Sequence, residues 1–415
     1  MNAILITVFV IGYLLIILEG KIRLNKAAMA LLSGGLCWLL YAFLSPDRSE
    51  VNASFMEHIG PIASILLFLM GAMTMVEIID DFDGFVLLQR VITSRNKKKF
   101  LFVITLFSFF LSAVLDNLTT AIVISTLVIK LVPDDQERKW ILGMVVIAAN
   151  AGGVWSPIGD VTTTMLWTGK QVSTIPLVKF LFLPSLVSVI ISYLIIVRKL
   201  KGQFPSLPAM ALKTGVGSDV MLLSGLFFLL LVPVLAAWST LAPCVVMLFC
   251  MSLLWVVGSI IRKKQAPHEE GTVLKALERI DLPTILFFFG ILISIAVLES
   301  AGLLEQAAHQ LSGRIPNQHV LLGGIGLISS VLDNVPLVAA LQAMYPIQHI
   351  PADSFFWHLL AYTSGTGGSL LIIGSAAGVV IMGPGKISFG WYLKNISLAA
   401  FLGYLGGFCC YLLFN

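Results

Sequence analysis

Two Asp-Asn pairs interrupt apolar stretches of this sequence. Asp116-Asn117 lies within SAVLDNLTTAIV (112–123), and Asp333-Asn334 lies within SSVLDNVPL (329–337). A third acid, Asp160, ends the segment NAGGVWSPIGD (150–160). Carboxylate, amide, hydroxyl and backbone carbonyl oxygens are the ligands that hard cations prefer. These residue types therefore predict the binding of a small cation.

The composition indicates the surroundings in which these acids must work. Hydrophobic residues make up 58% of the 415 positions and charged residues 12%. Apolar runs of about 17 to 25 residues recur along the chain, each long enough to cross a hydrocarbon layer of about 30 Å. The first run has no preceding basic residue and no small-residue cleavage site, so we expect a retained transmembrane helix. The sequence predicts an all-α integral membrane protein.

Ten spanning helices are expected from the apolar runs. They cover 2–18, 27–44, 60–79, 140–168, 174–197, 219–239, 242–261, 281–300, 358–383 and 395–414. With the loop that holds Lys97 to Lys99 inside, the outer loops contain only Arg48, Lys170, Lys179 and Arg314 of the 26 Lys and Arg. Both termini are then predicted outside.

Two remaining apolar segments, 100–130 and 320–344, are predicted to be re-entrant hairpins. Basic residues flank both ends of 100–130, which places both ends on one side of the membrane. Split at Asp116-Asn117, its halves would be roughly 20–24 Å long, too short to span. The alternative is that these segments form ordinary tilted spanning helices.

The two halves of the chain resemble each other. SAVLDNLTT (112–120) matches SSVLDNVPL at an offset of 217 residues, and GGVWSPIGD (152–160) matches GGSLLIIGS (367–375) at an offset of 215. Five crossings is an odd number, so the second half would enter the membrane from the opposite face. This pattern predicts an inverted-topology repeat of five spanning helices and one re-entrant hairpin in each half, as in transporters with a site near the midplane.

The predicted domains follow from this repeat. The first repeat covers 1–200, a cytoplasmic connector covers 201–218, and the second repeat covers 219–415. A loop at 262–281 is expected to contain a short amphipathic helix on the membrane surface.

Both long helices, 140–168 and 358–383, are predicted to be broken near the midplane. Each contains Gly-Gly with nearby polar residues, NAGGVWSPIGDVTTT in the first and TSGTGGSLLIIGS in the second. Breaks at membrane depth expose carbonyl oxygens and helix ends that can coordinate ions. Close helix contacts are the alternative explanation for the glycines.

Asp116, Asp160 and Asp333 are then expected at depth, with no Lys or Arg at the same level. An ionised carboxylate there costs at least about 2.5–3.5 kcal/mol, so each acid needs a proton or a cation as partner. Burial favours the protonated acid, whereas a bound cation favours the ionised form. One Asp can therefore hold a proton or a metal ion, and this competition is sufficient for exchange. The alternative, that these acids only cap helix starts, is plausible for one of them but not for all three.

With these motifs in place, the chain resembles the NhaD-type sodium/proton antiporters of the ion transporter superfamily. The resemblance is carried by SAVLDNLTTAIV, NAGGVWSPIGDVTTTMLW and SSVLDNVPLVAA. It implies ion-binding roles for Asp116, Asn117, Thr119, Asn150, Asp160, Thr162, Thr163, Asp333 and Asn334. It also suggests a homodimer with an elevator-like movement. Related divalent-anion symporters carry a Ser-Asn-Thr signature at the hairpin tips, where this chain has acids.

Supporting roles are expected for Ser112, Ser329, Ser364, Ser369 and Glu77. Ser112 and Ser329 each lie four residues before an Asp, on the same helical face. Glu77 has no acidic counterpart in the second half and lies within its helix or close to the inner boundary.

The predicted function is secondary antiport in the inner membrane of a bacterial-type cell, exporting Na+ or Li+ in exchange for H+, with no cofactor. One alternative is cation-coupled transport of a small anion or oxyacid, such as a dicarboxylate or arsenite; it rests on fold similarity alone. A remote alternative is an intramembrane aspartyl protease using Asp116 and Asp160. The chain has no nucleotide-binding motif, and we expect no nucleic-acid partner.

Overall fold

The computed structural model describes residues 2–17, 22, 24–90, 94–204, 217–265 and 276–414. Across these ranges the chain forms α-helices and two short 3-10 helices, without a β-strand. The all-helical class expected from the sequence is confirmed. Most of the predicted connector 201–218, and the middle of the loop in which an amphipathic helix was expected, lie outside the described residues.

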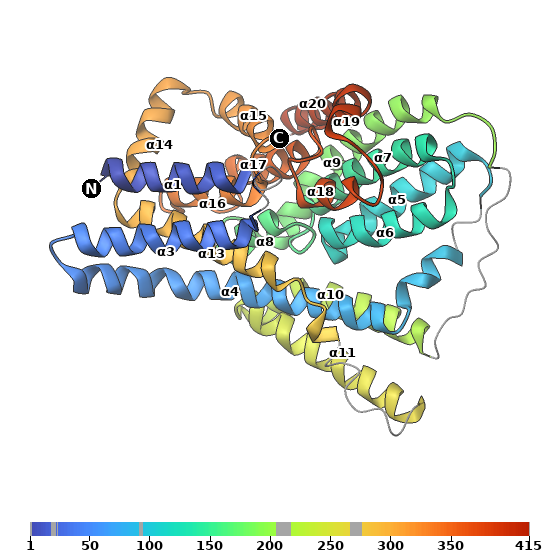
Figure 1. The fold of residues 1–415 in the computed structure, drawn as a ribbon, viewed down its shortest axis with the longest axis horizontal. Helices are drawn as coiled ribbons and strands as arrows, with labels where there is room; N and C mark the ends of the chain where they lie inside the picture. Colours follow the sequence, from blue (N-terminus) through green and yellow to red (C-terminus); the bar gives the residue numbers. More distant parts are fainter. Residues whose placement is uncertain are drawn as a thin grey trace.

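The helices form two groups (Figure 1). The first group, which we call the long-helix layer, comprises α1 (Asn2–Ile17), α3 (Lys26–Leu44), α4 (Arg48–Asp81), α10 (Ser218–Ser239), α11 (Pro243–Gln265) and α13 (Leu282–Ser300). Within it α3 packs along α13 and α4 along α11. Much of this layer lies along the lower side of the view in Figure 1.

The second group, which we call the broken-helix core, comprises α5 (Lys97–Leu115), α6 (Asn117–Leu131), α7 (Asp135–Gly153), α8 (Val161–Thr168), α9 (Thr174–Ile196), α15 (Gln318–Ser329), α16 (Asn334–Met344), α17 (Phe355–Gly367), α18 (Ala376–Met382) and α20 (Ser397–Phe414). The short elements η1 (Gly84–Arg90), η2 (Val197–Lys199) and α14 (Leu303–Arg314) lie between helices of the two groups, and α19 (Phe389–Asn395) lies between α18 and α20. Neither α14 nor α19 was predicted from the sequence.

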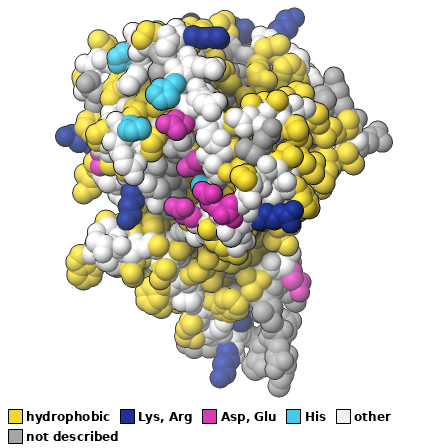
Figure 2. Space-filling model, turned by 90° about the vertical axis from the view of Figure 1, so that its left-hand side faces the viewer, with side chains coloured by type: hydrophobic (Ala, Val, Ile, Leu, Met, Phe, Trp, Pro, Cys, Tyr) yellow, Lys and Arg dark blue, Asp and Glu magenta, His cyan; other side chains and the backbone are white. Residues whose placement is uncertain are grey.

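Eight described helices are long and apolar enough to cross a membrane: α3, α4, α5, α9, α10, α11, α13 and α20. Apolar side chains on them are widely exposed; Trp238 of α10 is 83% exposed and Leu413 of α20 is 80% exposed. Figure 2, a view onto one end of the molecule, shows hydrophobic side chains over much of the visible surface. Water-soluble proteins rarely expose apolar surface of this extent. The eight long apolar helices and their exposed apolar side chains therefore identify the chain as a multi-pass membrane protein.

The predicted spans agree only in part with these helices. Seven of the predicted spans match a long helix, but 2–18 corresponds to the 16-residue α1. The spans 140–168 and 358–383 correspond to the pairs α7–α8 and α17–α18, which are broken where expected. The estimate that both halves of 100–130 are too short to span was wrong for the first half. α5 begins at Lys97 and has 19 residues, about 28 Å.

Helix α4 is also longer than expected. It has 34 residues and begins at Arg48, twelve positions before the predicted start at 60. The Asp47 side chain caps it by accepting hydrogen bonds from the backbone N–H groups of Ser49 and Glu50. Pro61 lies inside this helix rather than at its beginning.

The break between α5 and α6 is a single residue. Asp116 adopts φ 77° and ψ 162°, a backbone conformation that residues with a side chain rarely occupy. Its carboxylate caps α6 by accepting a hydrogen bond from the backbone N–H of Thr119 at 2.7 Å. The chain therefore turns sharply at the position that the sequence predicted as a hairpin tip.

Corresponding contacts recur in the two halves of the broken-helix core. The Ser112 hydroxyl donates to the backbone carbonyl of Ala149 at 2.5 Å, and the Ser329 hydroxyl donates to that of Ser364 at 2.7 Å. Both bonds fix an apolar helix, α5 or α15, against the first part of a broken helix, α7 or α17.

Candidate functional site

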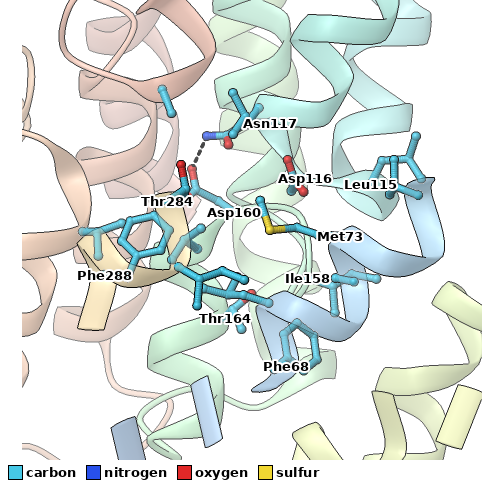
Figure 3. Close-up of a pocket in the computed structure, with 18 of the residues that line it drawn as sticks. Phe68, Met73, Leu115, Asp116, Asn117, Ile158, Asp160, Thr164, Thr284 and Phe288 are labelled. Carbon is cyan, nitrogen blue, oxygen red and sulfur yellow. Dashed lines mark hydrogen bonds between the residues drawn. The ribbon is translucent and has the colours of Figure 1, made fainter. Parts of the chain in front are cut away.

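Asp160 lies at the centre of a polar network in the broken-helix core. It precedes α8, is 1% exposed, and accepts hydrogen bonds from the backbone N–H and the hydroxyl of Thr162, both at 2.8 Å. Asn117 Nδ2 donates to Asp160 Oδ2 at 2.8 Å, as the dashed line in Figure 3 shows. Asn334 Nδ2 lies 3.4 Å from both Asp160 carboxylate oxygens. Both predicted Asp-Asn pairs therefore supply an amide to the same carboxylate.

Asn150, near the C-terminal end of α7, extends this network. Its side-chain oxygen accepts a hydrogen bond from Asn117 Nδ2 at 3.1 Å, and its Nδ2 donates to Ser375 Oγ at 2.9 Å. Ser375 caps α18 in the second half of the chain. The amide of Asn150 thus joins the two broken helices to each other.

Asp116 and Asp333 lie at the edges of this network. Asp116 Oδ2 accepts the Thr119 hydroxyl at 3.0 Å, in addition to the backbone N–H described above. Asp333 Oδ1 accepts the backbone N–H of Val335 at 3.3 Å and caps α16. Each acid stabilises the start of the helix that follows it.

The three acids line one cavity of about 60 Å³, which has room for a few water molecules. Figure 3 shows Asp116, Asn117 and Asp160 on one side of it and apolar side chains, including Phe68, Met73 and Phe288, around them. Apolar residues of α4, α10, α11 and α13 in the long-helix layer form part of the walls, and apolar residues of α5, α6, α8, α16, α18 and the α7–α8 break in the broken-helix core form the rest. The cavity therefore lies between the layer and the core.

Lys26 contradicts the expectation that no basic residue lies at the depth of the acids. It begins α3 and lines the same cavity as Asp333, with which its ammonium interacts electrostatically. From the sequence, Lys26 was expected in a loop on the inner side of the membrane, because it lies between the first two predicted spans. For Asp160 and Asp116, no ion pair with Lys or Arg is found among the described residues.

A second cavity of about 350 Å³ adjoins the first. It is lined by Glu77, Asp80, Thr119, Lys130 and Arg279, among others. Met73, Val76 and Leu118 line both cavities and separate them. Glu77 therefore lies outside the chamber that contains the three acids, while the Thr119 hydroxyl links that chamber to the second cavity.

The other predicted residues have structural contacts. The Thr163 hydroxyl donates to the Asp160 carbonyl at 2.8 Å. The Ser364 and Ser369 hydroxyls donate to the carbonyls of Leu360 and Thr366, both at 2.7 Å. Neither serine lines the cavity with the acids.

Three cavity-lining polar residues were not among the predicted site residues: Lys26, Thr164 and Thr284. Ser375, which bonds Asn150, was also omitted from the site, although it occupies the position of Asp160 at the 215-residue offset. That correspondence was the signal that could have identified it.

The ligand chemistry of this site favours a hard monovalent ion. Among the described residues, no three His, Cys, Asp or Glu side chains are close enough to hold a metal ion together. A cation at Asp160 would therefore depend on one carboxylate and on neutral amide, hydroxyl and carbonyl oxygens. Such a set suits Na+ or Li+ better than a transition metal.

Sequence comparisons identify transporters along nearly the whole chain. A family model described as citrate transporter (CitMHS) matches residues 13–362. Sodium/proton antiporter 1 of Arabidopsis thaliana is 42% identical over 408 residues, which cover 97% of this chain and 71% of that protein. The Na(+)/H(+) antiporter NhaD of Alkalimonas amylolytica is 32% identical over 452 residues, covering 99% of this chain and 90% of that protein.

A solved structure shares the fold. The YdaH transporter of Alcanivorax borkumensis aligns with a TM-score of 0.58 over 93% of this chain and 95% of its own. The sequences are 14% identical, so this likeness concerns the arrangement of helices alone.

Proposed function

We propose that this chain, which belongs to the citrate transporter family, exchanges Na+ for H+, as the names of its relatives indicate. It is a membrane transporter and not an enzyme. The resemblance to NhaD-type antiporters inferred from the sequence motifs agrees with the 32% identity to the NhaD protein, in an alignment that covers 99% of the chain.

One observation carries the proposal for the site. The Asp160 carboxylate is buried and is surrounded by neutral donors, Asn117, Thr162 and Asn334, without a Lys or Arg ion pair among the described residues. A buried carboxylate that lacks a permanent countercharge requires a proton or a mobile cation. Na+ and H+ would then occupy this carboxylate alternately, which couples their movements in opposite directions.

We assign the remaining roles around this carboxylate. The proposed ion-binding region comprises Asp116, Asn117, Thr119, Asn150, Asp160, Thr162, Thr163, Asp333 and Asn334. Asp116 is the second proposed carrier, because it lines the same cavity and its hydroxyl partner, Thr119, also lines the adjoining one. Ser112 and Ser329 support the site by fixing the packing of α7 and α17.

An inverted repeat is proposed as the architecture, with halves 1–200 and 219–415. The matching serine bonds described above support it. A further correspondence lies after α8 and α18, where Gly169-Lys170 and Gly385-Lys386 are 216 residues apart and both lysines have positive φ, 63° and 51°. Such a backbone is uncommon for lysine, so its recurrence at the repeat offset supports a common origin of the halves.

The proposed topology keeps both ends of 100–130 inside and both termini outside. Arg262 and Arg279 interact with Asp81 at the end of α4, the side that carries most basic residues. The opposite end, seen in Figure 2, gathers histidine and acidic side chains. We further propose a homodimer in a bacterial-type inner membrane, in which the broken-helix core moves against the long-helix layer.

Transport of an anion such as citrate is a second candidate, because the family model carries that description. The cavity contains Asp116, Asp160 and Asp333 but only Lys26 as a basic residue among its described lining. This excess of negative charge disfavours a polycarboxylate. Uptake of labelled citrate or succinate that depends on Asp160 would favour this candidate over cation exchange.

Proton movement in everted membrane vesicles tests the main proposal. Adding NaCl or LiCl to vesicles energised by respiration should release protons from the interior when the wild-type protein is present. Asp160→Asn should abolish this release, whereas Asp47→Asn, at the exposed cap of α4, should retain it. No response in the wild type, or an undiminished response in Asp160→Asn, would refute the proposal.

A further inference from the structure

Lys26 is the basic residue that the structure brings to the proposed ion site. It is the first residue of α3, and its ammonium lies over the ring of Phe287 in α13, 4.7 Å from the ring centre. The same side chain lines the cavity that contains Asp333. Lys26 is therefore held between an aromatic face and a cavity that contains carboxylates.

The contacts of α4 show how deep Lys26 lies. At one end of α4, Asp81 Oδ2 is 2.7 Å from Arg262 Nη2, and towards the other end His58 lies near the opposite surface. Phe68, which lines the cavity with Lys26, is about 15 Å along the helix from His58 and about 20 Å from Asp81. Lys26 is thus near the middle of the apolar stretch of α4.

This position is unfavourable for an ammonium group unless an anion is close. The first turn of a helix carries the positive end of the helix dipole, which repels a cation. A charge at membrane depth adds a desolvation cost. Asp333, at the start of α16 and in the same cavity, contributes a compensating charge, because its carboxylate interacts electrostatically with Lys26. Asp333 also interacts electrostatically with Asp160.

We infer that Lys26 is an affinity-determining residue of the exchanger, a fixed internal cation that competes with the transported cation for Asp333. This inference rests on the proposed Na+/H+ exchange. With Lys26 in place, one carboxylate of the cavity is already compensated, so Na+ is bound less tightly and is released more readily. Without Lys26, Asp333 would add its negative charge to the field that holds Na+ near Asp160.

Neutral substitutions of Lys26 test this competition. In Lys26→Met and Lys26→Gln, the apparent KM for Na+ at fixed pH should fall about three- to tenfold, and the maximal rate should fall with it because release is slower. Lys26→Arg keeps the charge and should keep the wild-type KM. Lys179→Met is the matched control, since Lys179 also lies over an aromatic ring, Phe180 at 5.5 Å, but does not line the cavity.

The Na+ affinity of purified protein, measured by thermal stabilisation over a Na+ titration, gives a readout besides transport. Tighter Na+ binding in Lys26→Met and Lys26→Gln supports the inference. Unchanged or weaker binding in both neutral variants, with Lys26→Arg folded, would overturn it.

A double-mutant cycle with Asp333→Asn in sodium-free choline buffer tests the pairing itself. Asp333→Asn should lower the melting temperature less when Lys26 is already Met than when Lys26 is present. Additive effects of the two substitutions would overturn the pairing. This cycle contains no Na+, so its result does not depend on the proposed exchange. Failure of the proposed exchange would instead appear as a lack of response of the wild type in the vesicle assay.

Discussion

Asn117 Nδ2 lies 2.8 Å from Asp160 Oδ2 and 3.1 Å from Asn150 Oδ1, so one amide joins the tip between α5 and α6 to both sides of the break between α7 and α8. The amide group satisfies two buried acceptors at once. Its removal would leave the Asp160 carboxylate with one neutral donor fewer, without changing the charge of the site.

Asn117→Leu tests the contribution of this amide. A hydrogen bond to a charged group is worth about 1.5–3 kcal/mol, so the KM for Na+ should rise about ten- to a hundredfold in vesicles. Asn334→Leu is the comparison, because its amide lies 3.4 Å from the Asp160 oxygens, and its effect should be smaller. Equal effects of the two substitutions would contradict the assigned geometry.

Competition between Na+ and H+ for Asp160 predicts a specific pH dependence. Lowering the pH fills the carboxylate with protons, so the apparent KM for Na+ should rise by up to about tenfold for each pH unit, with little change in the maximal rate at saturating Na+. Initial rates in proteoliposomes at several pH values measure this. A KM that stays constant while the maximal rate falls would argue against a shared site.

The glycines at the helix crossings predict a stability effect. A Cβ at Gly152 would lie 2.2 Å from the Phe109 carbonyl oxygen, and one at Gly367 would lie 2.1 Å from that of Gly326. Gly152→Ala and Gly367→Ala should each destabilise the protein by about 1–3 kcal/mol, seen as a lower melting temperature in detergent.

Gly324→Ala provides the control for this comparison. It lies in α15, and no atom beyond its chain neighbours and the adjacent backbone of its own helix comes within 4 Å of the position that an added Cβ would occupy, so the melting temperature of the variant should stay close to that of the wild type. Alanine has a higher helix propensity than glycine, so a similar loss in Gly324→Ala would mean that close packing does not account for the result.

Glu77 in the second cavity predicts an electrostatic effect on ion access. Glu77→Gln removes a negative charge from the chamber next to the acids, so the KM for Na+ should rise about two- to fivefold at low ionic strength. High choline chloride should reduce this difference by screening. Glu305→Gln, in a separate cavity with His309 and His349, should leave the KM unchanged.

The sequence predicted the polar interruptions well because membrane helices tolerate few of them. Asp116, Asp160 and Asp333 each interrupt an apolar run, as predicted. All three also cap a helix start in the structure, a role that the sequence favoured for only one of them. The breaks in α7–α8 and α17–α18 were predicted from Gly-Gly among polar residues, together with Pro157 in the first of them. Such local signals need no knowledge of the tertiary arrangement.

The sequence could not predict how deep each residue lies relative to its neighbours. Lys26 was assigned to a loop because it precedes an apolar run, but the packing of α3 along α13 places it beside the midpoint of α4. Hydropathy indicates only that α3 is apolar and how long it is. How far α3 is shifted along α13 depends on tertiary contacts, such as the hydrogen bond that Trp38 Nε1 donates to the Ile293 carbonyl at 2.8 Å. The length of α5 was underestimated because Lys97 to Lys99 look like loop residues, although Asn96 caps the helix before them.

The backbone of Asp116 limits what alanine scanning can reveal about this site. At φ 77° and ψ 162°, glycine is the residue that fits without strain. An alanine there would remove a charge and a helix cap while retaining the unfavourable torsion, so lost activity would combine misfolding with lost ion chemistry. Comparing glycine, which relaxes the torsion, with asparagine, which preserves the shape of the side chain, would separate these contributions.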